Sequence, residues 1–331
     1  SLRNTAADRM LELQLQVSGP APELLPQQWA TLKAPQPLSK MELQLTAVID
    51  AYAKIYPDRK NVPDLRLRAA SLQLAHGYAD TTRARIDTLL TSTPAAKATA
   101  AGIAILLIYH SERHEWDTTI KLATGYYEAE QIKDQQLRGR VRDAWRSAMW
   151  NKAGDQNEAN DLTGAAKTYT LFAETFPTDK AADQALANAS NAWLKQGNGQ
   201  EGVKPCLTLI SSYPRSNLRM TCLKSLAGVY EQRLEYSAAA DAYAQLATAP
   251  GCSSEVAAES LMKSADLYLD DRDLDGAAQK LQKLVHDYPK SIHAPAALLK
   301  LAASEKERDQ SEAAIAAYDK YFRLYANDHL E

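Results

Sequence analysis

Apolar residues recur at helical spacing along this chain, in short blocks separated by proline and by polar turns. The stretch 288–325 shows the pattern most clearly. It opens on an aromatic residue and a proline, and an apolar stripe follows through Leu298 and Leu301. The stripe breaks at the charged run 305–309 and resumes through Ala314. This pattern predicts two antiparallel helices joined by a short turn.

A proline that ends such a helix pair recurs at a nearly constant interval. Prolines that close such units are Pro57, Pro94, Pro177, Pro214, Pro250 and Pro289. Successive members are 36 to 39 residues apart, except for 83 residues between Pro94 and Pro177. A fixed period in this range is typical of solenoids of helical pairs. The sequence therefore predicts an all-α solenoid of antiparallel helix pairs, with about seven to eight pairs.

The long interval between Pro94 and Pro177 breaks the register. It exceeds two repeats by about nine residues, which lie somewhere between Arg113 and Leu162. We expect them in the polar stretch 154–161, as an enlarged loop or as a boundary between two sub-arrays.

Four regions follow from this reading. They are an N-terminal helix and proline-rich extended segment at 1–37, degenerate repeats at 38–153, a joint with the register slip at 154–178, and regular repeats at 179–331. Ser39 and Glu42 have the capping-box spacing and predict a helix start. Later helices are expected at 63–77, 80–92, 95–111, 115–129, 134–153, 158–175, 179–197, 200–212, 216–233, 235–248, 254–270, 273–287, 292–307 and 311–325.

Composition narrows the possible functions. Glycine (13) and phenylalanine (3) are scarce among 331 residues, which suits close-packed helices. The net charge of −3 lacks the basic excess of a nucleic-acid-binding protein. No run of 18 apolar residues exists, and the longest apolar stretch, 100–109, predicts a buried helix instead of a membrane span. No phosphate loop, nucleophile elbow or kinase signature occurs, so we expect no enzymatic activity and no cofactor.

Small and aromatic residues occupy repeated places in the last units. In the unit that closes at Pro289 they are Leu261, Ala265, Tyr268, Ala277 and Leu281. In the unit before it they are Leu223, Leu226, Ala227, Tyr230, Ala239 and Tyr243. This pattern resembles the tetratricopeptide repeat, and the resemblance implies a superhelix of helix pairs that binds protein partners. The last unit departs from it, with Glu305 in the tyrosine's place and Ala326 in the proline's.

The amino-acid sequence of the last two units resembles a narrower group of these repeat proteins. The string that begins YPKS and runs to Ala302 is similar to tetratricopeptide proteins of the Gram-negative cell envelope, such as the outer-membrane-assembly lipoprotein and the Tol–Pal-associated periplasmic coordinator. The resemblance implies a periplasmic or outer-membrane-associated scaffold, with the cytoplasm as the alternative. The protein or peptide partner is not named by any motif.

A stripe of amide and lysine side chains marks the candidate partner groove. Projected on the 37-residue register, Asn188, Ser225, Lys263 and Lys300 share one position on the first helices of successive pairs. Asn191, Lys195 and Lys224 lie beside them. Such side chains suit an extended backbone with acidic groups or a C-terminal carboxylate, although the same stripe is also expected of a solvated face.

A basic and aromatic cluster precedes the register slip. It comprises Arg142, Trp145, Arg146 and Trp150. The cluster is either a second partner surface or the filling of a wider joint between sub-arrays.

Three cysteines and two neighbouring histidines are the other candidate groups. Cys206 and Cys222 flank the turn at Pro214 at equal distances, so an oxidising compartment could join them; as free thiols they would be core residues. Cys252 would be left over, and no metal site is expected. His110 and His114 are expected as exposed residues of a turn.

Two alternatives to the partner groove remain open. The chain could be a structural module, monomeric or a weak dimer, that packs through the terminal helix 311–325 and its cluster of Tyr318, Tyr321, Phe322 and Tyr325. It could also be a glycan-binding accessory domain that uses exposed tryptophans and tyrosines.

Overall fold

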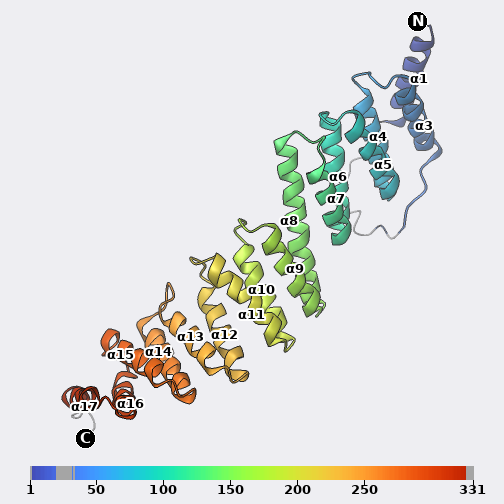
Figure 1. Ribbon diagram of the computed structural model, residues 1–331. Helices are drawn as coiled ribbons and strands as arrows, with labels where there is room; N and C mark the ends of the chain where they lie inside the picture. The colour runs from blue at the N-terminus through green and yellow to red at the C-terminus, as the bar shows by residue number, and fades with distance from the viewer. Residues whose placement is uncertain (1, 20–31, 33, 326–331) are drawn as a thin grey trace. The chain divides into compact units, whose positions relative to one another are not determined.

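A computed structural model gives the architecture shown in Figure 1. It describes residues 2–19, 32 and 34–325, and all the regular structure in these ranges is helical. The prediction of an all-α solenoid built from antiparallel pairs is confirmed. Most of the proline-rich part of the segment 1–37 lies outside the described residues, as does Ala326.

The chain divides into two compact units, residues 1–155 and 156–331. The first unit contains α1 (Leu2–Ser18), α3 (Lys40–Ile55), α4 (Val62–Ala75), α5 (Ala79–Ser92), α6 (Lys97–Glu112), α7 (Trp116–Glu128) and most of α8 (Gln135–Glu158). The second contains α9 (Leu162–Thr175), α10 (Ala182–Lys195), α11 (Gly199–Ser212), α12 (Arg219–Gln232), α13 (Tyr236–Ala247), α14 (Ser254–Asp270), α15 (Leu274–Asp287), α16 (Ala294–Glu307) and α17 (Ser311–Tyr325).

Local sequence explains where the helices begin. The expected capping box at the start of α3 is present, because Ser39 accepts from the Glu42 amide and Glu42 accepts from the Ser39 amide. In the second unit, Asp273 accepts from the Gly276 amide at the start of α15. These side-chain acceptors satisfy N–H groups that have no partner within the helix.

A residue in the left-handed backbone region joins the two helices of each pair. These residues are Gly77, His114, Asn160, Gly197, Leu234, Arg272 and Asp309. Successive members are 37 or 38 residues apart, except that 46 separate His114 from Asn160. The structure thus contains seven helix pairs of this kind, in the described residues, and one interval that is nine residues too long.

The nine extra residues lengthen a helix. α8 has 24 residues, whereas α10 and α12 have 14 each. The expectation of an enlarged loop at 154–161 is wrong, since residues 154–158 continue α8 and only the following turn is irregular. The polar sequence misled because part of it is used within the fold: Asp155 accepts from Trp116 and Gln156 accepts from Thr168, both as half-buried residues of α8. Asn157 and Glu158 lie exposed, where polar residues of a helix are normal.

Hydrogen bonds between successive repeats explain why an aromatic residue and a proline recur at the ends of the pairs. The Tyr213 hydroxyl donates to the Pro177 carbonyl at 2.8 Å, and the Tyr325 hydroxyl donates to the Pro289 carbonyl. In both cases the two residues are 36 positions apart. The tyrosine that ends one pair therefore ties that pair to the proline turn of the preceding one.

Small and branched side chains make up much of the core of the second unit, together with the buried rings of Phe172 and Phe176. Ala265, Ala277, Leu281 and Leu298 are fully buried or nearly so. Alanines at the crossing points allow the helices to approach closely, and leucines fill the spaces beside them. One charged residue, Glu305 of α16, is buried as well and takes the place expected for a tyrosine.

Candidate functional site

The predicted groove residues lie on the first helices of the last four pairs. They are Asn188, Asn191 and Lys195 of α10, Lys224 and Ser225 of α12, Lys263 of α14 and Lys300 of α16. We call this set the first-helix face. An ion pair between Lys300 and Asp266 joins α16 to α14, so neighbouring first helices contribute to one continuous surface there.

Two of the four lysines on the first-helix face are already neutralised. Lys263 pairs with Glu259 at 3.2 Å and lies 5.5 Å from the Tyr243 ring centroid, and Lys300 pairs with Asp266. Lys195 and Lys224 are exposed and make no ion pair within the described residues. The unpaired positive charge of the face therefore lies on α10 and α12.

The amide side chains of the face differ in availability. Asn188 is half-buried; its Oδ1 accepts from Gln184 Nε2 at 2.9 Å. Burial raises the pKa of the Tyr169 phenol, and a hydrogen bond with Asn188 acts in the opposite direction without reversing the shift. Asn191 is exposed. Asn191 is thus the amide best placed to meet a partner, whereas Asn188 holds neighbouring side chains.

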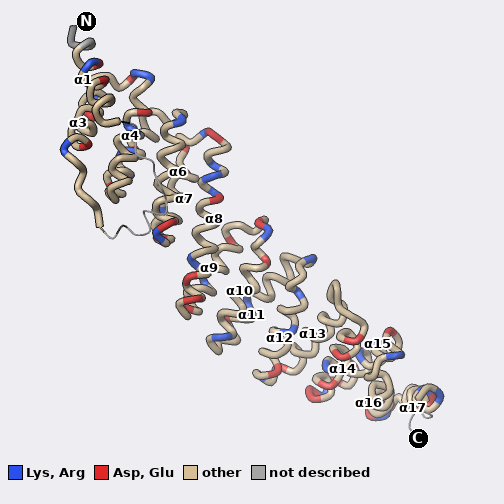
Figure 2. The backbone as a smooth tube through the Cα atoms, turned by 180° about the vertical axis from the view of Figure 1, so that it is seen from behind, with Lys and Arg blue, Asp and Glu red and all other residues tan. Residues whose placement is uncertain are grey.

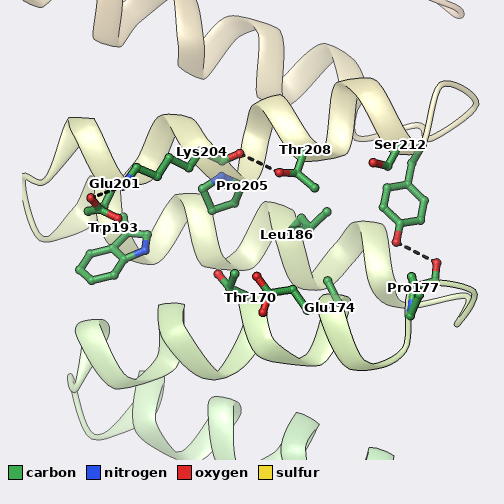
Figure 3. Close-up of a pocket in the computed structure, with 12 residues that line it drawn as sticks. Thr170, Glu174, Pro177, Leu186, Trp193, Glu201, Lys204, Pro205, Thr208 and Ser212 are labelled. Carbon is green, nitrogen blue, oxygen red and sulfur yellow. Dashed lines mark hydrogen bonds and ion pairs between the residues drawn. The ribbon is translucent and has the colours of Figure 1, made fainter.

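A pocket of about 380 Å³ lies over α10, between α9 and α11 (Figure 3). Its lining comprises Thr170, Ala173, Glu174, Pro177, Leu186, Trp193, Glu201, Lys204, Pro205, Thr208, Ser212 and Tyr213. Leu186 and Trp193 come from α10, while the other helical residues come from α9 and α11. None of these residues belongs to the first-helix face, so sequence reasoning missed the pocket; the proline inside the predicted helix 200–212 was its only signal.

Two carboxylates and one lysine give the pocket its charge. Glu201 accepts from Lys204 Nζ at 2.6 Å. Glu174 is exposed and makes no ion pair in the part of the chain that the structure describes. Burial raises the pKa of Tyr213, with the Asp183 carboxylate acting in the same direction. The pocket therefore holds one paired carboxylate, one unpaired carboxylate and neutral aromatic groups near pH 7.

Cys206 and Cys222 are free thiols in the structure, both buried. The Cys206 thiol donates to the Ser190 hydroxyl at 3.2 Å. A hydrogen bond from Cys222 lowers the pKa of Cys206, and the same bond, with burial, raises the pKa of Cys222. The two side chains are therefore neighbours across α11 and α12, and a disulfide between them stays a prediction.

Sequence comparison supports the repeat type directly. Residues 259–291 and 296–328 match the family model described as tetratricopeptide repeat. The C-terminal pairs are tetratricopeptide repeats. Repeats of this kind are typically protein-interaction scaffolds without catalytic activity. No curated protein matches the chain in sequence.

Solved structures with similar helical arrays are more distant. A MamA protein shares 14% identity over 56% of this chain and 96% of its own, with a TM-score of 0.34. PilF from Pseudomonas aeruginosa shares 17% over 71% and 95%, with a TM-score of 0.31. The P58(IPK) tetratricopeptide domain shares 14% over 98% and 94%, with a TM-score of 0.26. None of these likenesses bears on function.

The last tetratricopeptide repeat leaves an apolar face in solvent. On α17, Ile315 is 67% exposed, Phe322 62% and Tyr318 38%. Tyr321 and Tyr325 instead pack against the core of the unit. Of the four aromatic residues predicted as one contact cluster, two therefore lie on the surface and two pack against the apolar core.

The predicted second surface is partly core. Trp145 packs against the apolar cluster of the first unit, with its ring 6.0 Å from that of Tyr127. Trp150 is half-buried, Arg142 is exposed, and Arg146 lies 4.0 Å from Asp143. These contacts favour a packing role for Trp145, and a partner site at this cluster stays a prediction.

The histidines have different environments. His114 is an exposed turn residue, as expected, but the same expectation is wrong for His110, which is buried and bonds to Glu115 at 2.6 Å. His110 lies within α6, which ends at Glu112, so its side chain packs as a helix residue instead of lying in the turn. The described residues hold no cluster of three or more potential metal ligands. Within the same ranges, no helix is long and apolar enough to cross a membrane.

Proposed function

We propose that this chain is a non-catalytic scaffold that binds an acidic segment of a protein partner on the first-helix face. One observation carries the proposal: Lys195 and Lys224 are exposed and without ion pairs among the described residues, and Asn191, one helical turn before Lys195 on α10, is exposed as well. Lysines that pack or pair structurally, such as Lys300, are found farther along the same face. The two free lysines are thus available to an incoming carboxylate.

The binding energy of such a face comes from several weak contacts. An exposed ion pair contributes about 0.2–1 kcal/mol, so two lysines alone give weak affinity. Asn191 adds hydrogen bonds to the backbone of an extended segment, and the rigid helix pairs lose little entropy on binding. Because exposed charges are screened, binding is expected to weaken as ionic strength rises.

A labelled acidic octapeptide with a free C-terminal carboxylate tests this proposal by fluorescence anisotropy. Lys195→Glu and Lys224→Glu are expected to weaken its binding, each by about threefold or more. Lys283→Glu, on a second helix, is the matched control and should change binding little. Equal affinities for all three variants and the parent protein would show that the first-helix face is not the site.

We also propose a bacterial cell-envelope location, on the resemblance of the YPKS stretch alone. In cells that carry the native gene, osmotic shock should release the protein with a periplasmic marker, or membrane fractionation should place it with the outer membrane. Fractionation with a cytoplasmic marker would contradict this location.

A second candidate function is self-association through α17. The exposure of Ile315 and Phe322 supports it, because terminal repeats usually carry a polar outer face. Light scattering over a concentration series should then show a dimer, and Phe322→Glu should make it monomeric. A parent protein that is monomeric at every concentration would exclude this role.

A further inference from the structure

The pocket over α10 has features that the acidic-segment site does not explain. It lies among residues of α9, α10 and α11 that are separate from the first-helix face, and its unpaired charge is negative instead of positive. We propose that this pocket is a second partner site, which binds a basic side chain, arginine or lysine, of a peptide segment.

The shape of the pocket suits a long side chain with a charged end. Figure 3 shows Leu186 of α10 between the helix that carries Thr170 and Glu174 and the helix that carries Pro205. Leu186 and Pro205 are buried and present apolar surface to the methylene groups of such a side chain. A volume of about 380 Å³ lies within the range of sites that take small ligands or parts of larger ones.

The charged end meets carboxylates from two helices. Glu174 of α9 has no ion pair in the described residues, so an incoming cation does not have to displace a lysine or arginine from it. Glu201 of α11 is held by Lys204, which fixes the second carboxylate but leaves the lining with a net negative charge. This charge complements a guanidinium or ammonium group and disfavours an acidic ligand.

Two further groups favour a cation. Trp193 is half-buried in the lining, and an indole face attracts arginine and lysine. Pro205 lies inside α11 and has no N–H, so the Glu201 carbonyl lacks the donor that an unbroken helix would supply. Because Glu201 lines the pocket, we expect this carbonyl to accept from an N–H of the bound side chain.

The first test uses the peptide acetyl-Gly-Leu-Arg-Leu-Gly-amide and a matched peptide with neutral citrulline in place of arginine. The readout is the indole N–H resonance of Trp193, which is assigned by its loss in the Trp193→Phe variant. The arginine peptide should shift this resonance in a saturable way, and the citrulline peptide should bind about three- to tenfold more weakly. Equal binding of the two peptides, or no shift with either, would overturn the proposal.

Variants separate this site from the first-helix face. Glu174→Gln should weaken the arginine peptide about three- to tenfold, whereas Glu312→Gln on α17, an exposed glutamate outside the pocket, should have no effect. Binding of the acidic octapeptide should not change in Glu174→Gln. If the parent protein binds the arginine peptide but not the acidic octapeptide, only the first-helix face is refuted. If it binds the acidic octapeptide but not the arginine peptide, only the pocket is refuted. Displacement of the arginine peptide by a neutral oligosaccharide such as cellotriose would show a glycan site and overturn the proposal.

Discussion

Single residues at the helix–helix turns set the conformational cost of the repeat. Of the seven left-handed turn positions, two are glycine, and the others include Leu234 and Arg272. An L-residue with a side chain costs about 1–2 kcal/mol more than glycine in this region. The hydrogen bonds of the surrounding turn, such as the Asp273 amide to the Tyr268 carbonyl at 2.8 Å, hold the backbone there despite that cost.

Replacement of Gly197 measures this cost without interference from packing. Gly197 has φ +80 and a Cβ atom there would meet nothing within 4 Å, so Gly197→Ala is expected to destabilise the protein by about 1 kcal/mol. Gly228 lies inside α12 with the same open surroundings, so Gly228→Ala should instead stabilise by about 0.5–1 kcal/mol. Urea unfolding monitored by circular dichroism compares them; the same sign for both would contradict the left-handed assignment.

The buried carboxylate of Glu305 is a second residue-scale feature. It accepts from Gln282 Nε2 at 2.9 Å and from Arg308 at 2.6 Å, and its side chain is only 3% exposed. Arg308→Met would leave this carboxylate short of a charged donor, and we expect a loss of about 1–3 kcal/mol in unfolding free energy.

Two further variants control that measurement. Arg233→Met removes an exposed partner of Glu235 and should cost less than about 0.5 kcal/mol. The double variant Arg308→Met/Glu305→Met should recover much of the lost stability, because no buried charge then remains. An Arg308 effect as small as that of Arg233 would mean that the Glu305 pair contributes little.

At the scale of elements, sequence periodicity predicted helices better than connections. Ser39 with Glu42, and Tyr213 with Pro214, carry local signals for a helix start and a helix end, and both lie where expected. The continuation of α8 to Glu158 had no such signal, since Gly154 and the polar residues after it favour a turn locally. Tertiary packing of the α8 residues before Gly154, such as Ala148, Met149 and Ala153, outweighs that preference.

The pair α11 and α12 offers a test of element pairing. Treatment with glutathione disulfide is expected to join Cys206 and Cys222, with two protons and two electrons passing from the thiols to form reduced glutathione. A cross-link over a loop of this length stabilises by about 3 kcal/mol. Thiol titration of the unfolded protein should fall from three groups to one, and the Cys252→Ser variant should fall from two to none. Retention of all three thiols after oxidation would refute the pairing.

At the scale of the whole molecule, each of the two units has its own apolar core. Leu106, Leu122 and Val141 belong to a core cluster of the first unit, and Leu261 and Leu298 to one of the second. Because repeat arrays are stabilised by contacts between neighbours, each unit should tolerate separation from the other.

A fragment of residues 135–331, which keeps α8 intact, is therefore expected to fold alone. Its circular dichroism spectrum should be helical, and its thermal unfolding should be cooperative. The fragment contains α10 and α12, which carry Lys195 and Lys224, so the acidic octapeptide should bind the fragment as it binds the full chain. A disordered spectrum would show that the second unit depends on the first.

The binding surfaces were less predictable than the fold. The register placed Lys263 and Lys300 on one stripe with Asn188. Glu259 precedes Lys263 by four residues, the spacing of a helical ion pair, but the sequence gave no sign that Asp266 of α14 pairs with Lys300 of α16. The pocket over α10 depends on how three helices pack, and no local pattern encodes that arrangement. Only Pro205, an unfavourable residue for a helix interior, marked the place in the sequence.

The spacing of the left-handed turn residues has a consequence for how such a gene can change. From Asn160 to Asp309 the interval is constant to within one residue, so a duplication or deletion of one whole period would bring equivalent side chains back into equivalent places. A tyrosine such as Tyr213 would again find a proline carbonyl one period earlier. Across the 46-residue interval between His114 and Asn160 the same genetic event would leave surplus residues on one side. Repeats can thus be gained or lost in the C-terminal half of the array. Unequal recombination across α8 would instead join helices at non-equivalent positions of the repeat.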